Sequence, residues 1–198
     1  MAKLRRDAAR NRAALTAAAA EIFSEHGADA SLDLVARRAH LGRGTLYRHF
    51  ADRGALLATL LLERVELLDT YLEDTDDAQS LEQLVVEICG LVEDVPGLMA
   101  VVRRFESAEE PLDHVIARTG SLLKLAIERG QEAGTVRPDI TVEDVLAVIA
   151  MIDGARSLPD AHRVPDLAER ATALALRSLR PAEAVNLPVP RRAFAFPA

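Results

Sequence analysis

Residues 31–50, from Ser31 to Phe50, decide the fold of this chain; they read SLDLVARRAHLGRGTLYRHF. The pattern predicts two short helices joined by a tight turn. Ser31 is suited to cap the first helix, because its hydroxyl can accept from the free backbone N–H groups of the next turn. Gly42 marks a break between the helices, where the chain can turn sharply. The second helix then runs to Phe50, with Leu46 and Phe50 four residues apart on its buried side.

The other face of this second helix carries hydrogen-bond donors, an aromatic ring and no acid: Arg43, Thr45, Tyr47, Arg48 and His49. A solvated face usually mixes both charge signs, so an acid-free face indicates a polyanionic partner. A helix, a short turn and a short basic helix form the arrangement that fits a helix into the major groove of DNA. The sequence therefore predicts double-stranded DNA as a partner.

Three segments, in the right order and spacing, resemble the tetracycline-repressor (TetR) family of bacterial transcription regulators. Residues 44–50 (GTLYRHF) look like the family's signature, and residues 18–27 (AAAEIFSEHG) are similar to its first helix and closing glycine. Residues 51–57 (ADRGALL) lie where the family starts its fourth helix. Two positions depart from the pattern. His40 replaces a usual glycine, and Gly54 replaces an acidic residue or another good helix former.

Eight residues are expected at the DNA: Arg37, Arg43, Gly44, Thr45, Tyr47, Arg48, His49 and Arg53. Arg43 starts the second helix and can reach a base edge, with guanine O6 and N7 as its best partners. The resemblance implies that Tyr47 and His49 contact phosphates and that Arg53 is the family's basic residue at the start of the fourth helix. A partly buried position in the core is the alternative for Tyr47.

Charge is distributed unevenly along the chain. The 198 residues carry a net charge of −7, which alone argues against a nucleic-acid partner. Residues 1–57 hold ten Lys and Arg against six Asp and Glu, a net charge of +4, so the remainder carries −11. A basic N-terminal part, here called the head, on an acidic remainder suits a DNA-binding protein, because only the basic part then approaches the phosphates. The alternative is a head that is a salt-bridged globule.

The rest of the chain also predicts helices. Apolar residues recur at helical spacing from residue 52 to about residue 179. Ser80 and Thr141 are possible N-caps, and Gly134 ends a helix. We predict an all-α fold of about nine helices. Its parts are a helix-turn-helix DNA-binding domain at residues 1–51, a helical ligand-binding and dimerisation domain at residues 52–180, and a Pro-containing tail at residues 181–198.

Residues 145–152 (VLAVIAMI) are apolar all round, so their helix must be buried on more than one side. The final helix, expected from about Pro165 to Leu179, carries a narrow stripe of small residues. The resemblance implies that these last two long helices form a four-helix bundle in a homodimer. The alternative is that the first of them is simply the core of one subunit.

The resemblance also implies a small-molecule pocket among the fourth to seventh helices. Candidate lining residues are Leu67, Tyr71, Ile88, Cys89, Met99, Val102, Phe105, Ile116, Thr119 and Leu123. All of them except Thr119 are also ordinary core residues. Because aromatic residues are scarce, an aliphatic pocket is favoured over one that stacks planar cations.

Other classes of function find little support in the sequence. The five histidines are scattered without zinc-motif spacing, so we expect no metal, no cofactor and no catalysis. The single cysteine, Cys89, fits a reducing compartment, no stretch is apolar enough for a membrane span, and we expect a cytoplasmic protein. Our reading is a ligand-responsive repressor that binds a palindromic operator as a dimer and is released by a small molecule. A helical enzyme, or a membrane-surface or scaffold module, is the alternative.

Overall fold

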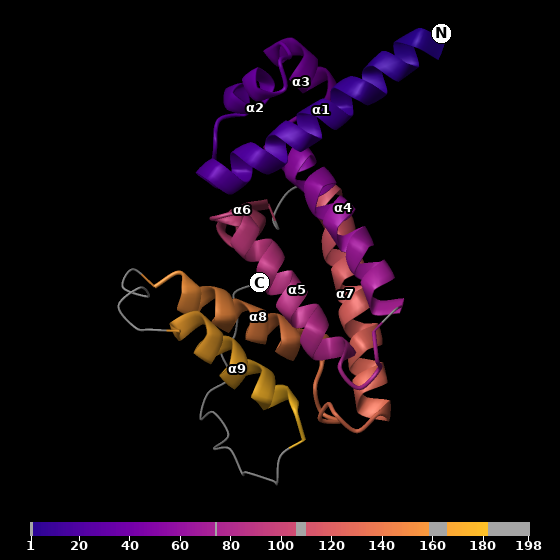
Figure 1. Ribbon diagram of the computed structural model, residues 1–198, viewed down its shortest axis with the longest axis vertical. Helices are drawn as coiled ribbons and strands as arrows, with labels where there is room; N and C mark the ends of the chain where they lie inside the picture. Colours follow the sequence, from indigo (N-terminus) through magenta and orange to yellow (C-terminus); the bar gives the residue numbers. More distant parts are fainter. Residues whose placement is uncertain (1, 74, 106–109, 159–165, 182–198) are drawn as a thin grey trace.

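The computed structural model describes the backbone of residues 2–73, 75–105, 110–158 and 166–181, and the side chains of residues 6–73, 75–101, 112–158 and 166–181. Within these ranges the chain forms nine α-helices and no strand, which confirms the predicted all-α fold (Figure 1). The helices are α1 (Ala2–His26), α2 (Leu32–Arg38), α3 (Arg43–His49), α4 (Arg53–Glu73), α5 (Ser80–Asp94), α6 (Leu98–Phe105), α7 (Glu110–Glu132), α8 (Val142–Arg156) and α9 (Leu167–Leu179). Residues 182–198, nearly all of the predicted tail, lie outside the described part, as does Pro165.

Helices α1, α2 and α3 form a head at one end of the molecule (Figure 1). Phe23 of α1, Leu46 of α3 and Phe50 are among the largest fully buried side chains of its core. Burying a side chain of this kind stabilises the fold by about 1.5–3 kcal/mol. The predicted buried side of the second helix, Leu46 and Phe50, is therefore confirmed.

Two of the three predicted helix caps are present. The Ser31 hydroxyl accepts from the Asp33 N–H at 3.2 Å, and Thr141 forms a capping box with Asp144 at the start of α8. Ser80 is not a cap, since it is the first residue of α5, and its hydroxyl donates to the carbonyl oxygen of Asp77. Ser80 is fully buried, so its hydroxyl has to find a partner inside the protein.

The sharp conformation between α2 and α3 belongs to His40 rather than to Gly42. His40 has a φ of 55°, in the left-handed region, whereas Gly42 has a φ of −74° and an extended backbone. The expectation that Gly42 supplies the tight conformation is therefore wrong. A glycine at position 40 would adopt this φ without steric cost, which explains why the TetR pattern has glycine there.

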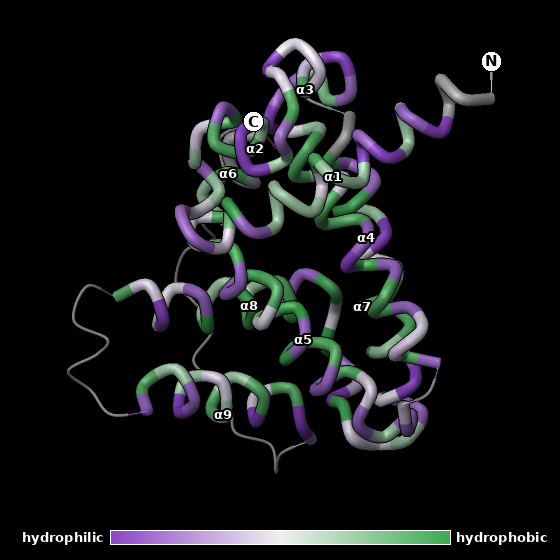
Figure 2. Tube along the Cα trace, turned by 45° about the horizontal axis from the view of Figure 1, so that its top comes forward, coloured by the Kyte–Doolittle hydropathy of each residue, from purple (hydrophilic) through white to green (hydrophobic). Residues whose placement is uncertain are grey.

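Behind the head, the remaining helices form a second core. Helix α4 packs along α7, and α5 packs against both α7 and α8. Figure 2 shows hydrophobic residues gathered on α5 and α8, where these helices lie together. Helix α9 packs on α8. All of its residues, 167–179, are described, and Leu179 is the one among them that is buried. Among the described helices, none is both long enough and apolar enough to cross a membrane.

The turn between α5 and α6 joins the two cores. Its Pro96 carbonyl oxygen accepts a hydrogen bond of 2.8 Å from the Ala28 N–H, in the loop that follows α1. Gly27, the residue before Ala28, has a φ of 82°. A Cβ added at Gly27 would lie 2.9 Å from the Pro96 carbonyl oxygen. Leu98 and Val101 of α6 are buried in the core of the head. The start of α6 is therefore held against the head.

Candidate nucleic-acid interface and ligand cavity

Helix α3 turns its polar side away from the core. The predicted contact residues Arg43, Gly44, Tyr47 and Arg48 are exposed, and Thr45 and His49 are half-buried. Tyr47 is 42% exposed, so it lies at the surface rather than in the core. The structure thus brings six of the eight predicted residues onto one short helix.

Arg43 is held by an acid from the neighbouring helix. Its Nε lies 3.3 Å from Oδ1 of Asp33 in α2, and its guanidinium carbon lies 5.5 Å from the centre of the Tyr47 ring. Hydrogen bonding with Tyr47, followed by the charge of Asp33, raises the pKa of Arg43. The face of α3 is free of acids in its own sequence, but α2 places one beside it. An exposed ion pair of this kind contributes little to stability, because solvent screens it, and it can give way to a DNA contact.

Arg48 lies back along its own helix. Its Nε donates to the carbonyl oxygen of Gly44 at 3.0 Å, and its Nη2 donates to the Thr45 hydroxyl at 3.2 Å. Arg48 and Thr45, predicted to share a face, are therefore in direct contact. Binding of Arg48 to a duplex would exchange these two bonds for bonds to DNA.

Arg12 of α1 fixes the C-terminal end of α3. Its Nη1 donates to the His49 carbonyl oxygen at 3.3 Å, its Nη2 donates to the Thr59 hydroxyl at 3.1 Å, and its guanidinium carbon lies 4.5 Å from the centre of the Phe50 ring. A cation there also interacts favourably with the helix dipole. The sequence prediction missed this residue, because its partners lie 37 and 47 residues away and no local motif connects them.

Two other arginines are engaged inside the head. Arg38 pairs with Glu21 at 2.6 Å and with Glu25 at 2.8 Å, and its hydrogen bond lowers the pKa of Glu25. Nη1 of Arg53 donates to the carbonyl oxygens of Ala28 and Ala30 at 2.6 and 2.5 Å. The head is thus in part the salt-bridged globule that the sequence left open as an alternative.

Arg37 and Arg53 complete the predicted DNA-contacting set and differ in their surroundings. Arg37, in the last turn of α2, is exposed. Arg53, predicted at the phosphates, uses Nη1 inside the protein to tie the start of α4 to the loop between α1 and α2. The sequence did not anticipate this internal role.

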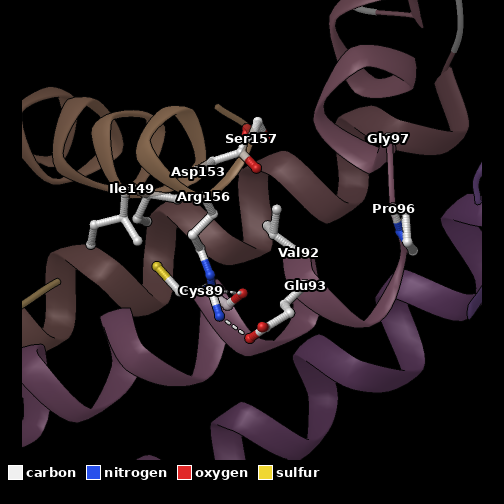
Figure 3. Close-up of a pocket in the computed structure, with 10 residues that line it drawn as sticks. Cys89, Val92, Glu93, Pro96, Gly97, Ile149, Asp153, Arg156 and Ser157 are labelled. Carbon is white, nitrogen blue, oxygen red and sulfur yellow. Dashed lines mark hydrogen bonds and ion pairs between the residues drawn. The ribbon is translucent and has the colours of Figure 1, made fainter. Parts of the chain in front are cut away.

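A cavity of about 270 Å³ lies between α5 and α8, beside the turn that leads to α6 (Figure 3). Arg156 of α8 reaches across it, donating to the Cys89 carbonyl oxygen at 3.3 Å and pairing with Glu93. Burial raises the pKa of the Cys89 thiol, which keeps the sulfur in its unreactive thiol form. The lining residues are Cys89, Val92, Glu93, Pro96, Gly97, Ile149, Ile152, Asp153, Arg156 and Ser157.

Of the residues predicted to line a ligand pocket whose side chains are described, Cys89 alone lines this cavity. Leu67 and Ile116 are 65% and 43% exposed, and Tyr71 is exposed with its hydroxyl near Gln83. Ile88 and Leu123 are buried in the second core, behind the head, and Met99 and Thr119 are half-buried. The side chains of Val102 and Phe105 lie outside the described residues. The structure does not bring the predicted set together around one cavity.

Helices α8 and α9 leave large apolar side chains uncovered. Leu146 and Met151 of α8 are 47% and 58% exposed, and Leu174 of α9 is 64% exposed. The other side of α8 is buried through Val145, Val148, Ile149 and Ile152. One chain therefore covers only one side of the helix that the sequence expected to be buried on more than one.

The head, with its turn between α2 and the outward-facing basic helix α3, is a helix-turn-helix module. Two family models match the chain. "Bacterial regulatory proteins, tetR family" matches residues 15–60, and "Transcriptional regulator SbtR-like, C-terminal domain" matches residues 78–181, which is more than half of the chain. The chain belongs to the tetR family of bacterial regulatory proteins, which are DNA-binding transcription factors and not enzymes.

Solved structures with similar folds include two regulators of this family. A TetR transcriptional regulator from Streptomyces coelicolor is 31% identical, with a TM-score of 0.57 over 87% of this chain and 99% of that chain. A TetR transcription regulatory protein from Mycobacterium vanbaalenii is 26% identical, with a TM-score of 0.59 over 89% of this chain and 99% of that chain.

A curated relative matches over a shorter region. An HTH-type transcriptional regulator from Staphylococcus aureus (strain USA300) is 31% identical over 75 residues, which is 37% of this chain and 40% of that protein. The chain thus spans less than half of the length of the curated relatives it matches.

Proposed function

We propose that this regulator is a ligand-responsive repressor that binds a palindromic operator as a homodimer and is released by a small molecule. The observation that carries the proposal is the outward-facing polar side of α3, with Arg43, Tyr47 and Arg48 exposed on a helix anchored by Leu46 and Phe50. Such a helix fits the major groove, where arginine recognises guanine. Its site of action is the cytoplasm, where bacterial DNA lies.

Dimerisation through α8 and α9 is supported by the exposed Leu146, Met151 and Leu174. Large apolar side chains exposed on two helices that pack together suit an interaction site, and a two-fold axis lets such a surface cover its own copy. A dimer also supplies two copies of α3. To read a palindrome in successive major grooves, the two helices have to lie about 34–36 Å apart.

Control by a ligand is supported by the position of the cavity. Pro96 lines the cavity, and its carbonyl oxygen accepts the hydrogen bond from Ala28 in the head. A ligand between α5 and α8 therefore acts on a residue that contacts the head directly. Leu67 and Tyr71, which the sequence predicted to line the pocket, are exposed and do not line this cavity.

The ligand can release DNA only by binding the DNA-incompetent state more tightly. DNA must then weaken ligand binding by the same factor. The affinity of a ligand, once one is in hand, is therefore to be measured with and without operator DNA. Equal affinities would leave a constitutive regulator, or one controlled by something other than a small molecule.

A gel shift with DNA from upstream of the protein's own gene tests the proposal. We expect one retarded complex that contains two chains, competed by unlabelled upstream DNA and far less by unrelated DNA of equal length. Equal competition by both DNAs contradicts sequence-specific binding. Attachment to anionic vesicles with no shift of DNA would favour a membrane-surface module instead.

A further inference from the structure

We propose that the cavity between α5 and α8 takes a small aliphatic amine in its protonated form, with Asp153 as the counter-ion. The inference rests on the proposed function, because it names the class of ligand for a ligand-responsive regulator. It follows from three properties of the cavity: the charges that remain in its lining, the nature of its apolar wall and its size.

The charges favour a cation. Glu93, Asp153 and Arg156 are the charged lining residues, so the lining carries a net charge of −1. Arg156 is already paired with Glu93 and bonded to the Cys89 carbonyl oxygen (Figure 3). Within the described part of the chain, the Asp153 carboxylate forms no ion pair. An anionic ligand would meet two carboxylates and a guanidinium that is already neutralised, whereas a cation would compensate Asp153.

The polar groups suit an ammonium group. An ammonium carries three N–H donors and no acceptor. The Asp153 carboxylate and the hydroxyl of Ser157, the C-cap residue of α8, are acceptors that line the same cavity. Charge-assisted hydrogen bonds of this kind are roughly twice as strong as bonds between neutral groups.

The apolar wall suits an alkyl chain. Val92, Ile149 and Ile152 are aliphatic, and the ten described lining residues include no aromatic ring. A quaternary ammonium is usually bound by a cage of aromatic rings, so this wall favours a primary or secondary amine instead. The volume of about 270 Å³ lies just below the usual range for ligand cavities, roughly 300–1,000 Å³, so the ligand must be small and its alkyl chain short.

Three unbranched six-carbon probes test the inference: n-hexylamine, hexanoate and n-hexanol. Their binding to the full chain is measured by calorimetry at neutral pH, where the amine is protonated and the acid is ionised. We expect hexylamine to bind about tenfold more tightly than either of the others, the difference that one charge-assisted hydrogen bond makes. Equal binding of hexylamine and hexanol, or tighter binding of hexanoate, overturns the proposal.

Two variants and a control locate the site. Asp153→Asn removes the counter-ion, and Glu93→Gln frees Arg156 to neutralise Asp153, so both are expected to weaken hexylamine binding about tenfold. Glu143→Gln removes the same charge from an exposed position of α8 outside the cavity and should leave binding unchanged. Melting temperatures without ligand show that each variant is folded. Full hexylamine affinity in folded Asp153→Asn overturns the proposal.

A gel shift with operator DNA separates the ligand class from the proposed function. DNA binding without Asp153-dependent amine binding would overturn this inference and leave the proposed function intact. Asp153-dependent amine binding by a protein that shifts no DNA would support the cavity assignment and contradict the proposed function.

Discussion

The backbone N–H of Ala28 donates a hydrogen bond of 2.8 Å to the carbonyl oxygen of Pro96, and this bond joins the DNA-binding head to the wall of the cavity between α5 and α8. Ala28 belongs to the loop that leads into α2, and its own carbonyl oxygen accepts from Arg53 at the start of α4. One short loop is therefore in contact with α4 and with the turn before α6. A movement of Pro96 has a direct path to the helix-turn-helix.

Gly27→Ala tests how closely Pro96 is packed against the head. Gly27 has a φ of 82°, and an added Cβ would lie 2.9 Å from the Pro96 oxygen. Gly134 has a φ of 71°, and an added Cβ there would meet open space. Gly134→Ala is therefore the control, because it carries the cost of a positive φ without a steric clash. We expect Gly27→Ala to lower the free energy of unfolding by at least about 1 kcal/mol more than the control, in urea titrations. Equal losses would show that Pro96 shifts freely.

His40→Gly is expected to stabilise the protein by up to about 1 kcal/mol. Glycine removes the steric cost of the φ of 55° at this position, and its greater freedom in the unfolded chain offsets part of the gain. Thermal unfolding of the variant and the parent measures the difference. A lower melting temperature in the variant would mean that the exposed His40 side chain contributes more than its backbone strain costs.

Arg53→Ala separates an internal role from a phosphate contact. Loss of the bonds to the Ala28 and Ala30 carbonyls should lower the free energy of unfolding by about 1.5–3 kcal/mol. If Arg53 also binds a phosphate, the slope of log K against log salt should flatten by roughly one unit per half-site. Arg37→Ala, at an exposed position, should change the slope without lowering stability. If Arg53→Ala leaves the salt dependence unchanged, Arg53 stabilises the fold and does not contact a phosphate.

Leu174→Asp tests the dimer. Leu174 of α9 is 64% exposed, and Leu67 of α4, at 65%, provides a control of the same residue type and exposure. Placing a carboxylate in an apolar interface leaves a buried charge without a partner, so Leu174→Asp should yield monomers in light scattering while Leu67→Asp remains dimeric. A dimeric Leu174→Asp protein would move the interface away from this part of α9.

The sequence predicts the head well because its signals are local. The cap at Ser31, the spacing of Leu46 and Phe50 and the donors of α3 all lie within one stretch of twenty residues. The same local reasoning fails at Ser80 and Gly42, where residue type suggests a cap and a sharp turn. Ser80 is buried as the first residue of its helix instead of capping it, and the residue with a left-handed backbone is His40, with a φ of 55°, instead of Gly42.

Features that join distant segments are not visible in the sequence. Arg12 finds its partners in α3 and α4, and Pro96 finds Ala28, through packing that no short motif records. The predicted lining of a ligand pocket shows the same limit. Leu67 and Leu68 are adjacent and equally apolar, yet Leu67 is 65% exposed and Leu68 is 5% exposed. On helices this rich in leucine, periodicity alone does not identify the side chains that face a cavity.

The most direct test of the account is the base preference of Arg43→Ala, measured by selecting bound sequences from a random DNA library with parent and variant. If α3 reads the major groove through Arg43, the variant should lose its preference at one base position in each half-site and keep the others. The lost discrimination should be about 1–3 kcal/mol. A variant that binds every sequence more weakly, with all base preferences unchanged, would contradict the claim that Arg43 reads a base.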